Sequence, residues 1–306
     1  MRDGTVLVTG ASGFLAAWTI PKLLAAGRRV VAADLKRDDT RLNLVTRNQP
    51  LPDLTWVEFD VGDEQACRDV TDSHQPVDIL HLAALMIPAC RSHPVAGARV
   101  NLLGHLNMLE AARAVGARLT YTSSAAAKPR GPANAPANLY GVYKRADEEI
   151  SRLFAEDFGV PSLGLRPNMV YGVGRDLGDT AVITAAARAA ACGEGYVLPW
   201  RARAGVQLVD DIAEIFCRVV QCEWQGAMVS DMGTMLTTTE EIVDSIRAVV
   251  PDAAISIDGP ERPVPTDGFE IDALAAIIGP LPQTPIGEGM AQTIAHFQDL
   301  REMALI

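Results

Sequence analysis

A short apolar run that ends in a glycine-rich turn constrains the fold of this chain more than any other feature. Residues Thr5-Val-Leu-Val-Thr9 have the length and composition of a buried strand, and Gly10-Ala-Ser-Gly13 follows directly. A helical pattern then extends from about residue 13 to residue 26, with Pro21 inside it. Glycines between a strand and a helix let a phosphate approach the backbone, where the helix N-terminus offers free N–H groups. The turn therefore predicts a dinucleotide-binding unit.

Strand-like and helical segments continue to alternate after this turn. Further strand-like runs lie at 29–33, 55–59, 78–82, 118–122 and 162–166, with helical patterns at 95–115 and 140–158. This alternation predicts an α/β fold with a Rossmann-like, doubly wound parallel sheet. From about residue 172 the pattern is less regular, with helical segments at 181–191, 211–221, 239–250 and 287–301.

An acidic residue at the end of the second strand bears on the choice of dinucleotide. Asp34 lies about 20 residues after the glycines, where a carboxylate can accept both ribose hydroxyls and would repel a 2′-phosphate. We therefore expect NAD as the cofactor. Lys36 and Arg37 are the evidence against this, because they could reach a phosphate if Asp34 turned away. After the third strand, we expect Asp60-Val61 to contact adenine, although Asp60 could also cap the next helix.

The organisation that we expect has two parts. An NAD-binding Rossmann domain would span 1–171, and a smaller, partly interleaved portion over 172–306 would mainly bind substrate. Some segments of the second portion would return to the first domain.

Charge and cysteine content limit the partners and the compartment. A net charge of -11 argues against nucleic-acid and anionic-membrane surfaces, since both require clustered Lys and Arg. The five cysteines are scattered, with no CxxC pair, which favours reduced thiols over a disulfide framework or a metal site. No apolar run reaches membrane-spanning length, and no leader pattern is visible. We expect a cytoplasmic protein that acts on a small molecule.

Tyr140 and Lys144 have the spacing of an acid/base pair. On a helix, residues four apart lie on one face, so the ammonium would stand beside the phenol. A neighbouring positive charge lowers the pKa of a phenol from about 10, which allows it to move a hydroxyl proton near neutral pH. Thr122-Ser123-Ser124 ends the fifth strand, where a hydroxyl could bind the oxygen of the same substrate.

Several motifs occur together and in order along the chain. They are Thr9-Gly10-x-x-Gly13-x-x-Ala16, Asp34, Asp60, His81-Leu-Ala-Ala84, Asn101, Ser123-Ser124, Tyr140-x-x-x-Lys144 and Arg166-Pro167-x-x-Val170-Tyr171-Gly172. With these motifs the chain resembles the extended short-chain dehydrogenase/reductase family, in its NAD-dependent epimerase/dehydratase branch.

The resemblance implies a role for each matching residue. The catalytic residues would be Ser124, Tyr140 and Lys144, with Ser123 as the alternative hydroxyl. The cofactor site would comprise Gly10, Ser12, Gly13, Phe14, Leu15, Asp34, Asp60, Val61, Leu82, Ala83, Ala84, Asn101, Tyr140, Lys144, Pro167 and Val170. The substrate site would comprise Met86, Ser123, Ser124, Asn168 and Arg175, and no metal is expected. A homodimer formed through the helix that carries Tyr140 and the helix before it is the family's usual assembly.

Departures from the family pattern bear on the substrate. Ala127-Lys128-Pro129 replaces a common Val-Tyr-Gly, His105 follows Gly104 where Thr is common, and Gln207 stands where sugar-nucleotide enzymes often have Arg. These changes favour a small substrate over a nucleotide-diphosphate sugar. The segment after Ser124 also lacks the extra acid that a dehydratase needs.

We therefore expect an NAD-dependent dehydrogenase that acts on a secondary alcohol of a small polyol, sugar or sugar acid. An arginine could clamp a carboxylate or phosphate of the substrate, and the candidates are Arg175, Arg201 and Arg203. The alternative is a sugar or nucleotide-sugar epimerase, in which tightly held NAD returns the hydride. A non-catalytic dinucleotide sensor is a third possibility, but it would be expected to have lost Tyr140 or Lys144.

Overall fold

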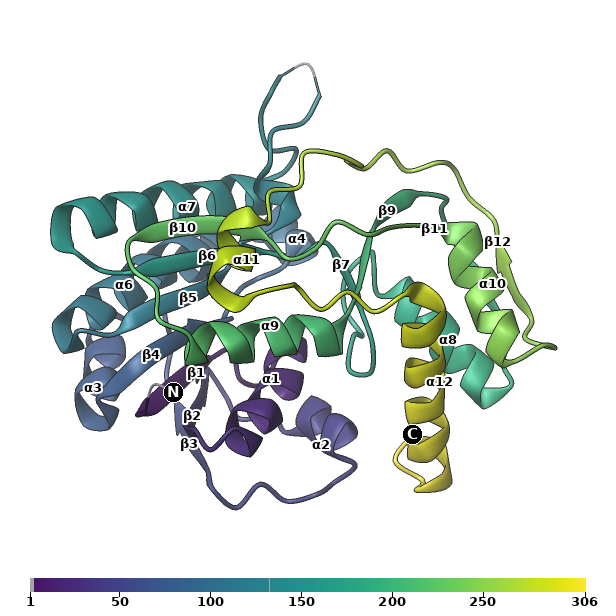
Figure 1. Cartoon of the computed structure of the whole chain (residues 1–306), viewed down its shortest axis with the longest axis horizontal. Helices are drawn as coiled ribbons and strands as arrows, with labels where there is room; N and C mark the ends of the chain where they lie inside the picture. Colours follow the sequence, from purple (N-terminus) through teal and green to yellow (C-terminus); the bar gives the residue numbers. More distant parts are fainter. Residues whose placement is uncertain (1–2, 132) are drawn as a thin grey trace.

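The chain folds around a parallel sheet with helices on both faces, as the sequence predicts (Figure 1). The structure is a computed structural model that describes residues 3–131 and 133–306. Over these residues the main sheet has seven strands in the order β10-β6-β5-β4-β1-β2-β3. The strands are β1 (Thr5–Thr9), β2 (Arg29–Asp34), β3 (Leu54–Glu58), β4 (Pro76–His81), β5 (Arg118–Thr122), β6 (Ser162–Arg166) and β10 (Ala227–Asp231).

Six of these strands were predicted, and three have the predicted bounds. The bounds of the other three differ from the predicted ones by one or two residues at an end; these strands are β2, β3 and β4. The seventh, β10, was missed. It comes from the second half of the chain and pairs in parallel with β6, from Ala227 opposite Ser162 to Asp231 opposite Arg166.

Helices of the first half flank the sheet. They are α1 (Phe14–Ala25), α2 (Thr40–Thr46), α3 (Glu64–His74), α4 (Ile87–Ser92), α5 (Pro94–Ala98), the π-helical turn η1 (Arg99–Leu103), α6 (Gly104–Val115), the 3₁₀ turn η2 (Ala125–Ala127) and α7 (Leu139–Phe158). Helix α1 runs through Pro21 without a break. The single helix predicted over 95–115 is instead α5, η1 and α6 in succession.

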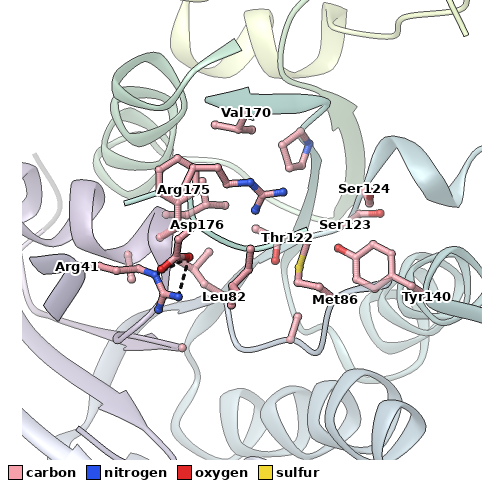
Figure 2. Close-up of a pocket in the computed structure, with 18 of the residues that line it drawn as sticks. Arg41, Leu82, Met86, Thr122, Ser123, Ser124, Tyr140, Val170, Arg175 and Asp176 are labelled. Carbon is pink, nitrogen blue, oxygen red and sulfur yellow. Dashed lines mark hydrogen bonds and ion pairs between the residues drawn. The ribbon is translucent and has the colours of Figure 1, made fainter. Parts of the chain in front are cut away.

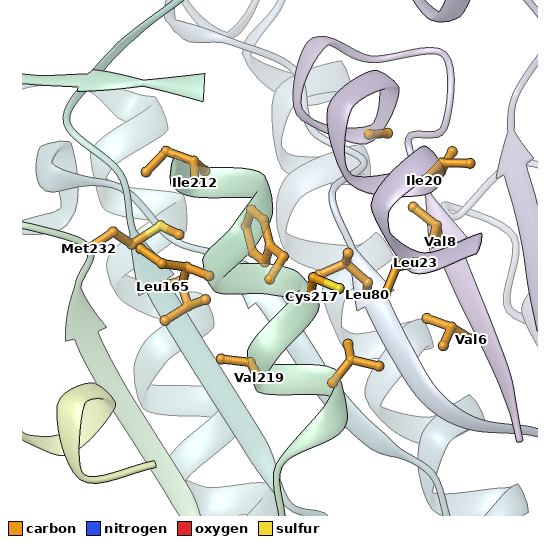
Figure 3. Packing of buried hydrophobic residues seen from close by; sticks show 14 of the residues in the cluster. Val6, Val8, Ile20, Leu23, Leu80, Leu165, Ile212, Cys217, Val219 and Met232 are labelled. Atoms are coloured by element: carbon orange, nitrogen blue, oxygen red, sulfur yellow. The ribbon is translucent and has the colours of Figure 1, made fainter. Parts of the chain in front are cut away.

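Alternation of side chains along β1 explains the two layers of helices. Val6 and Val8 point into a cluster with α1 and with α9 (Val209–Gln221) (Figure 3). Leu7, between them, points to the opposite face and packs in a cluster with α3 and α6. Because β1 lies between β2 and β4, the strand order reverses beside it, which is where open α/β sheets bind ligands.

The second half of the chain builds a smaller layered unit and also contributes to the main sheet. Its helices are α8 (Val182–Cys192), α10 (Thr239–Val249), α11 (Asp272–Ile278) and α12 (Ile286–Glu302). A three-stranded sheet joins β11 (Leu236–Thr238), β9 (Arg203–Leu208) and β7 (Met169–Tyr171), and β12 (Ile255–Ile257) pairs with β8 (Tyr196–Leu198). Helices α9 and α11 pack on the main sheet, so the two halves interleave.

Membrane-spanning helices are not found in 3–131 and 133–306: no helix there has both the length and the apolarity to cross a bilayer.

Candidate active site

The glycine-rich turn lies between β1 and α1, where only glycine fits at its first position. Gly10 has φ +69°, and a Cβ there would lie 2.6 Å from the backbone nitrogen of Ala83. Gly13 N–H donates to the Gly10 carbonyl at 2.9 Å, which closes the turn. Helix α1 then begins without a capping side chain and without an acidic residue in its first turn. Its first N–H groups therefore remain available to an anion, and the residues fit the pyrophosphate of a dinucleotide.

The Asp34 carboxylate is held against this turn. It accepts hydrogen bonds from the backbone N–H of Ser12 at 2.9 Å and of Leu35 at 2.8 Å. Of the two cations that could favour NADP, Arg37 is paired with Asp39 at 2.6 Å. The arrangement fixes a carboxylate beside the turn, and its expected contact with the adenosine ribose of NAD stays a prediction.

A cavity of about 280 Å³ opens beside the turn and reaches the carboxyl end of β5 (Figure 2). Fourteen of the predicted site residues line it: Gly10, Gly13, Phe14, Leu15, Leu82, Ala84, Met86, Ser123, Ser124, Tyr140, Pro167, Asn168, Val170 and Arg175. Seven others do not line it: Ser12, Asp34, Asp60, Val61, Ala83, Asn101 and Lys144. The cavity thus brings together the glycine-rich turn and the candidate catalytic hydroxyls.

Asp60 lies beyond the cavity and does not cap a helix. Its carboxylate accepts from the Gly62 N–H at 2.8 Å and pairs with Arg99 at 2.8 Å. Helix α3 is capped instead by Asp63, which accepts from the Ala66 N–H. The capping alternative for Asp60 is therefore wrong, and the expected contact with adenine stays a prediction.

Asn101 anchors the segment that follows β4. Its side chain accepts from the Leu85 N–H and donates to the Leu85 carbonyl, both at 2.9 Å. The residue is buried in the π-helical turn η1, a local irregularity that often marks functional sites. Met86, which follows the anchored residue, lines the cavity.

Helix α7 carries Tyr140 in its first turn. The Asn138 side chain caps the helix by accepting from the Gly141 N–H at 2.9 Å, which sets where the helix begins. Tyr140 is 6% exposed and Lys144 is 2% exposed. Burial raises the pKa of Tyr140, whereas the Lys144 charge and a hydrogen bond with Ser124 lower it. Burial has the larger effect, so the pKa of Tyr140 lies above its ordinary value, and not below it as the spacing of Tyr140 and Lys144 predicts.

The two neighbouring serines have different surroundings. Ser124 stands beside the phenol, and its hydroxyl also accepts from the Ala126 N–H at 3.1 Å. The Ser123 hydroxyl donates instead to Glu148, which holds Arg166 in a two-pronged ion pair. Of the two, Ser124 has the position expected of the catalytic hydroxyl.

Arg175 directs its guanidinium into the cavity from the side opposite the Tyr140 hydroxyl (Figure 2). One terminal nitrogen donates to the Thr180 hydroxyl at 3.1 Å, and the buried Nε has no hydrogen-bond partner among the described residues. Burial lowers the pKa of this arginine. The other two candidates lie elsewhere: Arg201 donates to the Gly259 carbonyl at 2.9 Å, and Arg203 is exposed on β9.

Asn168, which also lines the cavity, has a buried side-chain nitrogen without a hydrogen-bond partner in the described structure. The Asn168 N–H donates to the Gln207 side chain at 2.8 Å. Gln207, one of the departures from the family pattern, therefore positions a lining segment. Lys128, another departure, pairs with Asp231 at the end of β10.

Three charged residues around the site have no role predicted from the sequence, and of these Asp176 is noticeable only as part of the expected substrate portion. Arg41 and Asp176 form an ion pair at 2.8 Å on the cavity lining, and Arg41 also donates to the Ser12 carbonyl (Figure 2). Asp147 is buried beside Lys144. Arg41 and Asp176 are 135 positions apart in the chain, so no local sequence pattern predicts that they form an ion pair. Asp147 and Glu148 stand three and four residues after Lys144, so helical spacing puts both near the lysine without deciding between them.

Similar proteins share both the sequence and the fold. Residues 6–227 match the NAD dependent epimerase/dehydratase family. A UDP-glucose 4-epimerase of Mycolicibacterium smegmatis is 26% identical over 96% of this chain and 98% of its own length. A UDP-glucuronate 4-epimerase of Arabidopsis thaliana is 30% identical over 55% of this chain, but over only 40% of its own length.

Solved structures extend the similarity in fold. The Thermus thermophilus UDP-glucose 4-epimerase, in complex with NAD, superposes with a TM-score of 0.79 at 24% identity, over 96% of this chain and 99% of that one. An L-threonine dehydrogenase from Clostridium difficile gives 0.80 at 20% identity, over 99% and 100%. The match over most of the chain confirms the resemblance, the Rossmann-like fold and the cofactor predicted from the sequence: this chain is an NAD-dependent enzyme and belongs to the NAD dependent epimerase/dehydratase family.

Proposed function

We propose that the chain is a dehydrogenase that oxidises a secondary alcohol of a small polyol, sugar or sugar acid. The observation that carries this proposal is the single cavity shared by Gly10, Ser124, Tyr140 and Arg175, with Lys144 buried behind the phenol. The first of these residues would place the cofactor, the next two would handle a hydroxyl, and the arginine would bind an anion. Among the three substrate classes, the buried Nε of Arg175, which has no hydrogen-bond partner among the described residues, favours the sugar acid.

The proposed chemistry assigns one task to each catalytic side chain. The Tyr140 oxygen takes the hydroxyl proton while the carbinol carbon gives up hydride, so that a ketone forms. Ser124 donates a hydrogen bond to the same substrate oxygen and keeps it beside the phenol. Lys144 stabilises the phenolate by its charge, which favours the basic form of Tyr140. NAD, when bound, supplies the hydride acceptor.

The expected cofactor contacts are proposed on the same basis. The residues that would hold NAD are the Gly10–Gly13 turn with Phe14 and Leu15, Asp34 and the strand-end segment Leu82–Ala84. Asp60, Val61, Asn101, Pro167 and Val170 would complete the site. Support comes from the close fit of the turn to Leu82 and Ala83, directly after β4, and from the fixed Asp34 carboxylate. We also propose that residues 172–306 form most of the substrate-binding portion, since Arg175 comes from there.

An epimerase is the second candidate, and a specific observation favours it. The Mycolicibacterium relative that is similar over nearly its whole length is named a UDP-glucose 4-epimerase. In that reading the hydride returns to the opposite face of the ketone, and NADH does not accumulate. The same side chains would serve, because oxidation of the carbinol is common to both reactions.

A substrate screen distinguishes these reactions. The protein is incubated with NAD and a panel of polyols, sugars and sugar acids, while NADH absorbance and substrate stereochemistry are both followed. We expect NADH to accumulate with a sugar acid. Inversion of a carbinol without net NADH would instead establish the epimerase.

Tyr140→Phe is the companion variant. We expect it to lower turnover by about 10²- to 10⁴-fold while NAD binding is unchanged, because only the proton-transferring oxygen is removed. Retained turnover in this variant would contradict the catalytic assignment.

We propose that the protein forms a homodimer through α5, η1 and α7. Large apolar side chains are exposed on these three neighbouring elements: Val95, Leu103, Leu139, Val142, Leu153 and Phe158. Exposed apolar side chains that gather on adjoining helices are typical of an interaction surface. The proposed assembly would place two copies of the Tyr140 helix near one another.

We also propose a cytoplasmic location. The five cysteines are free thiols, and Cys67, Cys90 and Cys217 are buried. Reduced thiols fit a reducing compartment.

A further inference from the structure

A buried carboxylate stands directly behind the proposed catalytic pair. Asp147 lies on α7, three residues after Lys144, with its Oδ2 3.3 Å from the lysine Nζ. The lysine side chain is 2% exposed and the aspartate side chain is 0% exposed. The second carboxylate oxygen of Asp147 is also buried and has no hydrogen-bond partner among the described residues. A carboxylate in such a place is costly unless a positive charge compensates it.

The groups around Asp147 leave Lys144 as that positive charge. The groups that interact with Asp147 come from α6, β5 and α7 itself: His105, Tyr121, Tyr140, Lys144 and Glu148. Around these lie His81 on β4, Cys90 on α4 and Arg166 on β6, which interact with Lys144, Tyr140 and Glu148 respectively. Burial lowers the pKa of His81 to about 3 and that of His105 well below its ordinary value, so both rings are neutral. Arg166 is already paired with Glu148.

The same carboxylate acts on the phenol. The Lys144 charge lowers the pKa of Tyr140, and the Asp147 charge raises it, so the two members of the pair have opposite effects. The carboxylate is fixed, because one helical turn links it to the lysine and no solvent reaches it. A change in its charge therefore alters the electrostatic potential at Tyr140 without any movement of the chain.

We propose that Asp147 is a positioning residue of the active site: it holds the Lys144 ammonium behind Tyr140 and, when ionised, weakens the stabilisation that this ammonium gives the phenolate. The proposal rests on the assignment of Tyr140 as the acid/base. It adds to that assignment a group that neither touches the substrate nor lines the cavity.

Protonation of Asp147 makes the effect depend on pH. Burial raises the pKa of Asp147 to about 7, against the lowering effect of Lys144. Below this pH the carboxyl group is neutral and the lysine charge acts on the phenol unopposed. Above it the carboxylate offsets part of that charge. The phenol therefore becomes harder to ionise as pH rises through neutrality, whereas an isolated Tyr–Lys pair would not change in this range.

The test is a titration of the Tyr140 phenol by NMR in the protein without NAD. Tyrosine is labelled with ¹³C at the ring carbon that bears the hydroxyl, and Tyr140→Phe assigns the resonance. We expect the wild-type resonance to show an inflection near pH 7 before the phenol itself ionises. In Asp147→Asn the inflection should disappear, and the phenol should titrate roughly one pH unit lower.

Two further variants control the comparison. Asp147→Glu keeps the charge and should restore the inflection. Asp157→Asn removes an exposed carboxylate from the same helix and should leave the resonance unchanged. If Asp147→Asn does not fold, the wild-type inflection alone decides, because no other group described near the phenol titrates there. A wild-type resonance that is flat through pH 7 would overturn the proposal.

The readout separates this proposal from the proposed function. The titration needs neither cofactor nor substrate, so it gives an answer even if no carbinol is oxidised. Conversely, turnover retained by Tyr140→Phe would remove the function while the coupling of Asp147 to the phenol could still be observed.

Discussion

Arg175 is the side chain that most constrains the charge of the substrate. Its guanidinium points into the cavity, and its buried Nε has no partner in the described part of the chain. An anionic substrate would satisfy this group. We expect Arg175→Gln to raise KM for the substrate by roughly 10- to 100-fold, the worth of a charge-assisted hydrogen bond, while NAD affinity is unchanged.

Steady-state kinetics with two further variants test this expectation. Arg175→Lys should recover only part of the loss, because an ammonium cannot form the planar two-pronged contact of a guanidinium. Arg203→Gln changes an exposed arginine on β9 and should leave KM as it is. Equal values of KM for wild type and Arg175→Gln would mean that the substrate carries no anion at this position.

Among single residues of the candidate site, the sequence predicts those that belong to a local pattern and misses those that do not. Tyr140 and Lys144 are recognisable by their spacing, and Ser124 by its place after a strand. Asp147 is one of several charged residues in Lys144-Arg-Ala-Asp-Glu-Glu149, and the pattern alone does not say which of them face inward. Arg41 and Asp176 meet only because the chain folds.

Helix α7 should show its buried carboxylate in the pH dependence of folding. The pKa of Asp147 is raised from 3.8 in the unfolded chain to about 7 in the fold. The folded protein therefore holds a proton that the unfolded chain has lost between these values. The resulting stabilisation is complete below pH 3.8 and is lost as pH rises through 7, by about 4 kcal/mol in total.

Urea denaturation between pH 4 and pH 8 measures how the free energy of unfolding changes with pH. We expect the free energy of unfolding of the wild type to fall, relative to that of Asp147→Asn, as pH rises. His81 and His105 have lowered pKa values and act in the opposite direction, but they are present in both proteins and cancel in the difference. A difference that does not vary with pH would show that Asp147 is ionised throughout.

Secondary-structure elements were predictable where the local sequence alone determines their conformation. Six of the seven strands of the main sheet are short apolar runs, and β1, β5 and β6 have the bounds that this pattern predicts. The strand β10 was missed, and its place in the sheet depends on pairing with β6, about 65 positions away in the chain. The 95–115 segment reads as one helix, yet its buried Asn101 binds the Leu85 backbone from a π-helical turn.

For the whole molecule, the exposed apolar side chains of α5, η1 and α7 predict self-association. We expect the wild type to be a dimer by light scattering after size exclusion. Val142→Glu combined with Leu153→Glu should give a monomer, because two charges would be buried without partners at the interface.

The matched control for the dimer is Val197→Glu. Val197 is 53% exposed, comparable to Val142 at 46%, but it lies on β8 in the smaller unit. This variant should remain a dimer. A monomeric wild type, or equal dissociation by both substitutions, would rule out the proposed interface.

The return of the chain to the main sheet affects how the protein is made. Until residues 227–231 have left the ribosome, β6 has no strand paired on its outer side. The buried side of α1 is likewise uncovered until α9 has been synthesised. Two buried arginines, Arg28 and Arg118, donate hydrogen bonds to the Val220 carbonyl, which they can do only after α9 has been synthesised. The nascent first half therefore emerges with an open strand edge, the kind of surface that aggregates or recruits chaperones. Synthesis of the last third completes the main sheet as well as the smaller unit.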